Sequence, residues 1–166
     1  MQAMLVLATA LMLGGGPAWK TFAPQAAGFE VLLPGNPTEK RQTVRTIQGN
    51  GELRLFTLGG KAGSYAVGVT ELPDAAVTPG KEEQRLDLAR DGAVQQATGR
   101  LRWEKKILVA GCHGRDLAIG NDAGATVRIR LIADHNRLYQ LLVVGDAAFL
   151  DSPDAARFLD SFKHRR

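Results

Sequence analysis

The alternation of apolar and polar residues predicts a chain built mostly from short strands. Residues 29–33 (FEVLL) place an apolar side chain at every second position and end at Pro34-Gly35, which is typical of a strand. Comparable patterns predict seven further strands. These cover residues 43–47, 53–58, 64–72, 101–109, 114–119, 125–133 and 137–144.

Short polar turns between these segments indicate that consecutive strands run antiparallel. Gly49-Asn50-Gly51 separates two predicted strands, and an Asn-Gly pair at this place is typical of a hairpin turn, since both turn residues need positive φ. Residues 120–122 and 134–136 are further short polar turns. Parallel neighbours would need a long crossover, so these turns favour an antiparallel sheet.

The strand predicted for residues 125–133 has the clearest alternation. Val127, Ile129 and Leu131 are expected to face the core. Arg128 and Arg130 lie between them in the sequence and are expected to face solvent.

Two segments have the helical period instead. In residues 78–99, Thr78 is expected to cap the helix, Pro79 to take its first position and Gly99 to follow its end. The apolar stripe of this helix is thin and rich in alanine, so the helix is expected to rest on a sheet; the stripe is Leu86, Ala89, Ala93 and Ala97.

The second helix is predicted over residues 152–162. Ser152 caps it and Pro153 occupies its first turn. Its apolar residues recur at steps of three and four, so this helix must dock on the sheet; they are Ala155, Phe158, Leu159 and Phe162. Antiparallel strands with two helices in a chain of 166 residues predict a single α+β domain.

The first eighteen residues differ from the rest because they contain no Asp, Glu, Lys or Arg. The apolar run of residues 4–13 is shorter than the roughly 20 residues of a membrane span, but fits the apolar region of a signal peptide. We expect cleavage between Ala18 and Trp19, which leaves residues 19–166 as an exported domain in the periplasm, in the cell envelope or outside the cell. No basic residue precedes the run, so two alternatives stay open: a start further upstream, or a buried N-terminal strand or helix.

Charge and cysteine content argue against a nucleic-acid partner and against an internal disulfide. Twenty-one Lys and Arg against 17 Asp and Glu give a net charge of +4, and the only tight basic cluster is the tail 163–166. A nucleic-acid binder should gather its basic residues on one face, so no nucleic-acid partner is expected. Cys112 is the single cysteine, so an exported chain would fold without an internal disulfide.

The candidate chemistry centres on Cys112, His113 and the nearby Asp116. A Cys/His pair could form a thiolate nucleophile or a metal site, but adjacent residues on an extended chain point in opposite directions. A single cysteine also cannot supply the Cys-x-x-Cys spacing common in zinc sites. Beyond these three candidates the sequence predicts no catalytic, cofactor-binding or metal-binding residue.

Other residues that could carry chemistry have simpler explanations. His135 in a polar turn and His164 in the tail are expected to lie in solvent. Trp103 and Tyr139 lie on predicted strands and are expected in the core. Three acidic residues are explained as parts of the second helix, without a calcium or acid/base role: Asp151, Asp154 and Asp160.

Both ends of the chain resemble a known group. Residues 19–37 are similar to the opening W-x-x-F-x-P…G-F-x-V-x-x-P-G-x-P of uncharacterised secreted bacterial proteins of the PsbP-like fold group; PsbP itself is an extrinsic subunit of photosystem II. Residues 137–141 and 151–162 resemble the group's R-x-Y-x-L…F-x-x-S-F ending. The resemblance implies an α/β/α sandwich with a central antiparallel sheet of about six or seven strands and two main helices. The group usually has proline where this chain has Cys112, and no functional residue is carried over.

These observations favour an exported, non-catalytic binding or accessory module for a protein, an envelope component or a small ligand. The mature chain is expected to have no cofactor and no membrane span. One alternative is a secreted hydrolase whose catalytic residues converge from distant loops. A further alternative is an intracellular partner of a small GTPase, because the resemblance extends to a Ran-binding nuclear protein of the same fold.

Overall fold

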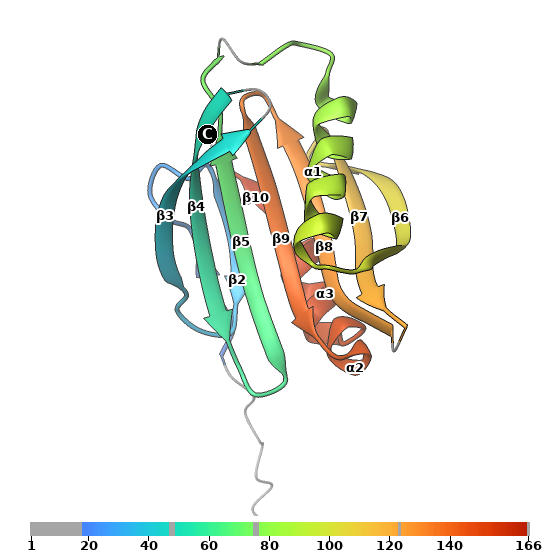
Figure 1. Ribbon diagram of the computed structural model, residues 1–166. Helices are drawn as coiled ribbons and strands as arrows, with labels where there is room; N and C mark the ends of the chain where they lie inside the picture. Colours follow the sequence, from blue (N-terminus) through green and yellow to red (C-terminus); the bar gives the residue numbers. More distant parts are fainter. Residues whose placement is uncertain (1–17, 47–48, 75–76, 123, 166) are drawn as a thin grey trace, which may run out of the picture.

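The computed structural model describes residues 18–46, 49–74, 77–122 and 124–165. A seven-stranded antiparallel sheet runs through the middle of the domain, in the order β3-β4-β5-β9-β8-β7-β6 (Figure 1). Its strands are β3 (Thr38–Thr46), β4 (Gly49–Gly59), β5 (Gly63–Glu71), β6 (Arg100–Val109), β7 (Cys112–Asn121), β8 (Gly124–Asp134) and β9 (Arg137–Gly145).

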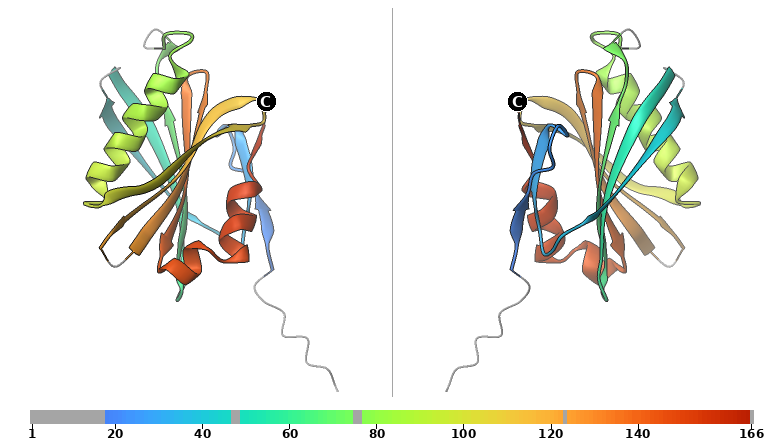
Figure 2. Two further views of the ribbon diagram at one scale, coloured as in Figure 1. Left: turned by 90° about the vertical axis from the view of Figure 1, so that its right-hand side faces the viewer. Right: turned by 90° about the vertical axis from the view of Figure 1, so that its left-hand side faces the viewer.

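Both faces of this sheet are covered, as Figure 2 shows. One face carries α1 (Glu82–Gln96). The other face carries α2 (Ala147–Leu150), α3 (Pro153–Asp160) and a small antiparallel sheet in the order β1-β2-β10. The small sheet consists of β1 (Lys20–Phe22), β2 (Phe29–Leu33) and β10 (Lys163–His164). The α+β class and the sandwich around an antiparallel sheet are therefore confirmed.

Aromatic side chains fill the layer between the large sheet and α3. Phe29 of β2 is fully buried and packs against Tyr139 of β9 and Phe162, with ring centroids 6.0 and 6.3 Å apart. Phe158 on α3 is also fully buried and meets Tyr65 at 5.2 Å. Each buried Phe contributes about 1.5–3 kcal/mol, so this layer holds α3 and β2 on the sheet.

The second helix agrees closely with its prediction. Ser152 caps α3, because its side chain accepts a hydrogen bond from the Ala155 N–H, and Pro153 opens the helix. The short helix α2, capped by the Asp146 side chain, was not predicted. Its four residues are too few to show a helical period.

The opposite layer is smaller and aliphatic. Leu86 of α1 is fully buried and packs in a cluster with Leu117, Ile119, Ile129 and Leu131. Alanines on α1 complete the contact, as its thin apolar stripe predicts.

Helix α1 begins later than the sequence pattern predicts. It starts at Glu82, and Lys81 occupies the cap position without a side-chain cap hydrogen bond. Gly80 has φ +76°, a left-handed conformation that separates Thr78 and Pro79 from the helix. The prediction that Thr78 caps the helix is therefore wrong.

The hairpin between β3 and β4 is confirmed, but its predicted turn is wrong. Asn50 and Gly51 belong to β4 and pair with Arg45 and Val44 of β3. A Cβ atom at Gly51 would lie 2.9 Å from the Glu71 carbonyl oxygen, so the glycine allows close approach of β5. Residues 47–48 connect the strands and lie outside the described residues.

The prediction that Arg128 and Arg130 face solvent is also wrong. Both lie on the sheet face that carries α3, and Arg130 is only 12% exposed. Its guanidinium donates to the carbonyl of Leu159 on α3 at 2.9 Å and pairs with Asp160 at 2.8 Å. Alternation shows which residues share a face of the strand, but not whether that face is in solvent. Both faces of this sheet are covered, so the polar face of β8 is also packed against a layer.

The predicted leader, residues 1–18, lies outside the described residues except for Ala18, so its cleavage and export stay predictions. Within the described part of the chain, no helix has the length and apolarity to cross a membrane.

Candidate functional site

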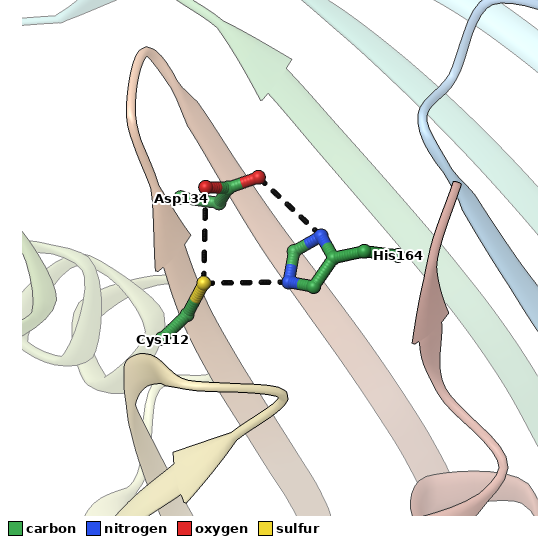
Figure 3. A group of neighbouring side chains, drawn as sticks. All are labelled: Cys112, Asp134 and His164. Carbon is green, nitrogen blue, oxygen red and sulfur yellow. Dashed lines mark hydrogen bonds and ion pairs between the residues drawn. The ribbon is translucent and has the colours of Figure 1, made fainter. Parts of the chain in front are cut away.

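Three side chains from distant parts of the chain converge on one face of the sheet: Cys112 at the start of β7, Asp134 at the end of β8 and His164 in β10 (Figure 3). The Cys112 Sγ lies 3.4 Å from the His164 Nε2. The His164 Nδ1 lies 3.3 Å from Asp134 Oδ2. Sγ is also 3.7 Å from Asp134 Oδ1, so the three groups contact one another in a closed triangle.

Two tight turns place the first two members. Ala110 and Gly111 join β6 to β7 with φ values of 50° and 83°, and positive φ at both positions is the backbone of a two-residue hairpin. Cys112 is therefore the first residue of β7, paired with Val109. Asp134 ends β8, just before the exposed turn residue His135, which has φ 49°.

The short strand β10 places His164. Lys163 pairs with Glu30 and His164 with Phe29, and the Arg165 N–H donates to the Gly28 carbonyl at 3.0 Å. The imidazole meets the Tyr139 and Phe162 rings edge-on, at 5.6 and 5.1 Å between centroids. Its side chain is 17% exposed, so the expectation that His164 lies in solvent is wrong.

The triad lines a cleft of about 510 Å³, named here the C-terminal cleft. Its lining is rich in positive charge, with Arg137, Lys163 and Arg165 against the single carboxylate of Asp134. The complete lining is Gly28, Ala110, Cys112, Asp134, Arg137, Tyr139, Phe162, Lys163, His164 and Arg165.

Arg137 forms the inner wall of this cleft. Its Nε donates to Glu71 Oε2 at 3.1 Å, and Tyr139 donates its hydroxyl to the Gly28 carbonyl at 3.3 Å. Burial opposes the charge on Arg137, but hydrogen bonds to Tyr139 and Glu71 prevail and hold its pKa above the ordinary value. Burial raises the pKa of Tyr139. Gly28 has φ +72°, a conformation that favours glycine, and its missing side chain leaves room for the Arg137 guanidinium and the Tyr139 hydroxyl.

The three candidate residues from the sequence, Cys112, His113 and Asp116, do not form one site. Cys112 belongs to the triad, whereas His113 points to the opposite face and its Nδ1 contacts Glu83 Oε1 at 3.0 Å. Adjacent strand residues thus point in opposite directions, as expected. Asp116 is buried and pairs with Arg128 and Arg130 at 3.1 and 3.0 Å.

No local signal marks Asp134 and His164 as partners of Cys112, since they lie 22 and 52 residues away in the sequence. Tyr139 is buried, as predicted. Trp103 was expected in the core, but it is 44% exposed under the Arg128 guanidinium, 5.6 Å from its ring centroid.

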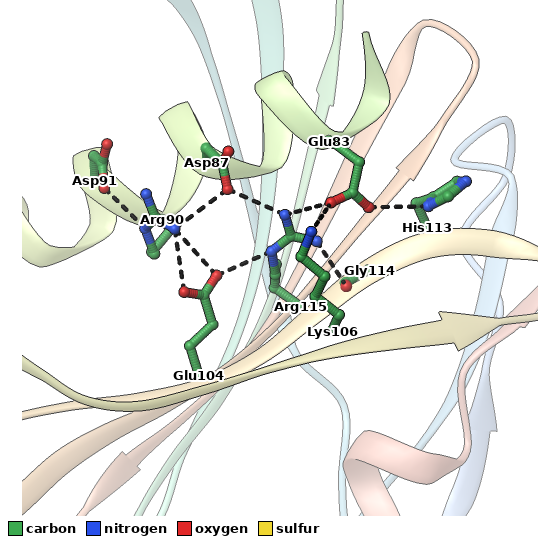
Figure 4. Close-up of polar contacts among 9 residues, drawn as sticks. All are labelled: Glu83, Asp87, Arg90, Asp91, Glu104, Lys106, His113, Gly114 and Arg115. Carbon is green, nitrogen blue, oxygen red and sulfur yellow. Dashed lines mark hydrogen bonds and ion pairs between the residues drawn. The ribbon is translucent and has the colours of Figure 1, made fainter. Parts of the chain in front are cut away.

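On the other face, an ion-pair network joins α1 to the sheet (Figure 4). The Arg115 guanidinium of β7 is 2% exposed and contacts Glu83 at 2.6 Å, Asp87 at 3.1 Å and Glu104 at 3.0 Å. Hydrogen bonds from Arg115 and Lys106 lower the pKa of Glu83 from 4.5 to about 2. Every acid here has a basic partner, so the network is a structural attachment of α1.

Of three comparisons with known proteins, the one with solved structures bears on the fold. No protein-family model matches the sequence, and no curated protein matches it. Among solved structures, the chain is similar to the solution structure of cyanobacterial PsbP (CyanoP) from Synechocystis sp. PCC 6803. The TM-score is 0.57 at 10% identity, over 92% of this chain and 95% of the other. The fold is therefore PsbP-like.

The Arg115 network predicts acid sensitivity. Because the pKa of Glu83 is lower in the folded protein, its ionised form stabilises the fold above pH 4.5, and this contribution is lost as the pH falls toward 2. We expect Glu83→Gln to lower the urea midpoint at pH 7 and to flatten its decline between pH 4.5 and 2. Glu52→Gln, an exposed acid on β4, is the control and should follow the wild-type curve; parallel curves for wild type and Glu83→Gln would contradict the prediction.

Proposed function

We propose that this protein is an exported, non-catalytic binding module that holds an anionic ligand in the C-terminal cleft. The observation that carries the proposal is the charge of the cleft lining, where the basic side chains of Arg137, Lys163 and Arg165 outnumber the one carboxylate, Asp134. The ligand class is a small carboxylate or phosphate, or such a group displayed by an envelope component or a protein.

Two of the basic residues are open to a ligand. The Lys163 and Arg165 side chains are 73% and 58% exposed, and both approach Glu30 only at 3.5 and 3.8 Å. Exposed ion pairs of this kind contribute about 0–1 kcal/mol, so an incoming anion can compete with Glu30. Arg137 adds a cation whose position is fixed by Glu71.

Two other clefts of similar size have a smaller excess of basic over acidic side chains in their linings, or none. They occupy about 550 and 520 Å³ and share Arg41 and Arg54 in their walls. Both arginines already pair with Glu39, at 2.7 and 2.9 Å. An anion there would have to displace a carboxylate at hydrogen-bonding distance, so the C-terminal cleft is the better site.

One observation favours a hydrolase as the second candidate. The triad contacts run from Sγ to Nε2 and from Nδ1 to Asp134 Oδ2, the order of nucleophile, base and orienting acid. Binding is preferred because Sγ also contacts the Asp134 carboxylate, which is the orienting group in that arrangement.

Anion binding can be tested by NMR titration of the chain with inorganic phosphate and with citrate, in buffer freed of metal ions by a chelating resin. We expect amide shifts at residues 163–165 and around Arg137, weakening as salt rises. Reversing two charges in Lys163→Glu/Arg165→Glu should reduce affinity at least tenfold, about 1.4 kcal/mol. Lys40→Glu/Lys61→Glu, two exposed lysines outside the cleft, should retain wild-type affinity. Shifts elsewhere, or none, would argue against the proposal.

Export can be tested by fractionating a bacterial host that expresses the full chain. The expected product lies outside the cytoplasm and begins at Trp19, a cut that leaves β1 complete. An uncut cytoplasmic product would support the intracellular alternative.

The hydrolase alternative makes a different prediction with p-nitrophenyl acetate. A binding module should release at most about one equivalent of nitrophenolate, by acetylation of the Cys112 thiol, without turnover. Multiple turnovers that disappear in Cys112→Ala and persist in His113→Gln would establish catalysis instead.

A further inference from the structure

We infer that Cys112, Asp134 and His164 form a binding site for a divalent transition metal of borderline softness, with Zn²⁺ as the reference ion. This inference uses the triad itself and does not depend on the anion proposed for the surrounding cleft.

The donor set points to this class of metal. A thiolate sulfur, an imidazole nitrogen and a carboxylate oxygen are the three kinds of ligand that Zn²⁺ takes in proteins. Calcium and magnesium take oxygen ligands almost entirely, so a site with one sulfur and one nitrogen disfavours them.

The spacing of the donor atoms fits a tetrahedral ion. One donor atom from each residue lies within 4.8 Å of the others. Bonds of about 2.3 Å to sulfur and 2.0–2.2 Å to nitrogen or oxygen put tetrahedral donors roughly 3.4–3.6 Å apart. The observed contacts are 3.4 Å for Sγ to Nε2 and 3.7 Å for Sγ to Asp134 Oδ1.

The imidazole must make one adjustment. Its Nε2 faces Cys112 while its Nδ1 faces Asp134, so the triad is joined by contacts to both nitrogens (Figure 3). A metal would use one nitrogen, with the ring turning about its own side-chain bonds. Cys112 and Asp134 need little movement, because β7 and β8 are neighbouring strands of the large sheet.

Three protein ligands leave the fourth tetrahedral position open. All three residues line the C-terminal cleft, so that position is accessible from it. A thiolate and a carboxylate balance the two charges of the ion, which offsets the repulsion from Arg137, Lys163 and Arg165. The thiol proton leaves on binding, so affinity should rise with pH.

No second group of this kind is found in the described residues. The nearest comparison, His113 beside Glu83, shares its carboxylate with Arg115 and Lys106, which already supply positive charge. A metal there would have to displace both bases, whereas the triad contains no lysine or arginine.

The test is a titration of the reduced, metal-free full chain with Co²⁺, followed by Zn²⁺. We expect one equivalent of Co²⁺ to produce a near-ultraviolet thiolate-to-cobalt absorption band, which Zn²⁺ abolishes and Ca²⁺ leaves unchanged. Cys112→Ser should lose the band. His164→Gln and Asp134→Asn should weaken Zn²⁺ affinity at least about tenfold, because even loss of a residue that only orients a ligand costs 10–100-fold.

His113→Gln is the matched control, since it lies next to Cys112 but points to the opposite face, and it should bind as the wild type does. Absence of the band, its persistence in Cys112→Ser, or an equal loss in His113→Gln would overturn the inference. NMR spectra establish that each variant is folded, and if Cys112→Ser is not, alkylation of Cys112 in the folded wild type takes its place. The phosphate titration is run in metal-free buffer, so failure of the metal site and failure of anion binding are separate results.

Discussion

The pairing of β10 with β2 is the contact on which the candidate site depends. The strand β10 forms through two residue pairs with β2, Lys163 with Glu30 and His164 with Phe29. Phe29 and Phe162 are buried in the aromatic layer, so both strands of this ladder are anchored in the core. Without that anchor, His164 would belong to a basic tail and Cys112 and Asp134 would lack their third partner.

The two faces of the large sheet are covered by different physical means. Stacked and edge-on aromatic rings hold α3 and β2, and this apolar contact is independent of ionisation. Helix α1 has a thin apolar stripe and depends also on carboxylates around the buried Arg115 guanidinium. A buried cation is costly unless it is paired, so the attachment of α1 is sensitive to protonation of the carboxylates around Arg115.

The C-terminal cleft combines two kinds of chemistry over a few residues. Soft and borderline donors lie together at Cys112 and His164, and cations project at Lys163 and Arg165. A bound metal with an open position and a basic surrounding would both favour an anion. The fold supplies this arrangement by returning the C-terminal strand to β2, beside the β6–β7 hairpin.

The strands β1 and β10 were not predicted, since three and two residues are too few to show a period. The sequence by itself determined most other local elements: period-two alternation located β2 and the strands of the large sheet, Ser152 and the spacing of Phe158 and Leu159 located α3, and short turns implied antiparallel order. Those features arise from residues within a few positions of one another. Only the tertiary structure decided that Arg130 lies under α3 and that Asp134 and His164 meet Cys112. Period-two alternation does not reveal whether the polar face of a strand is covered by another layer. The contact between Cys112 and His164 spans 52 residues, and no local sequence pattern predicts it, because the two segments are brought together by burial of a shared apolar core.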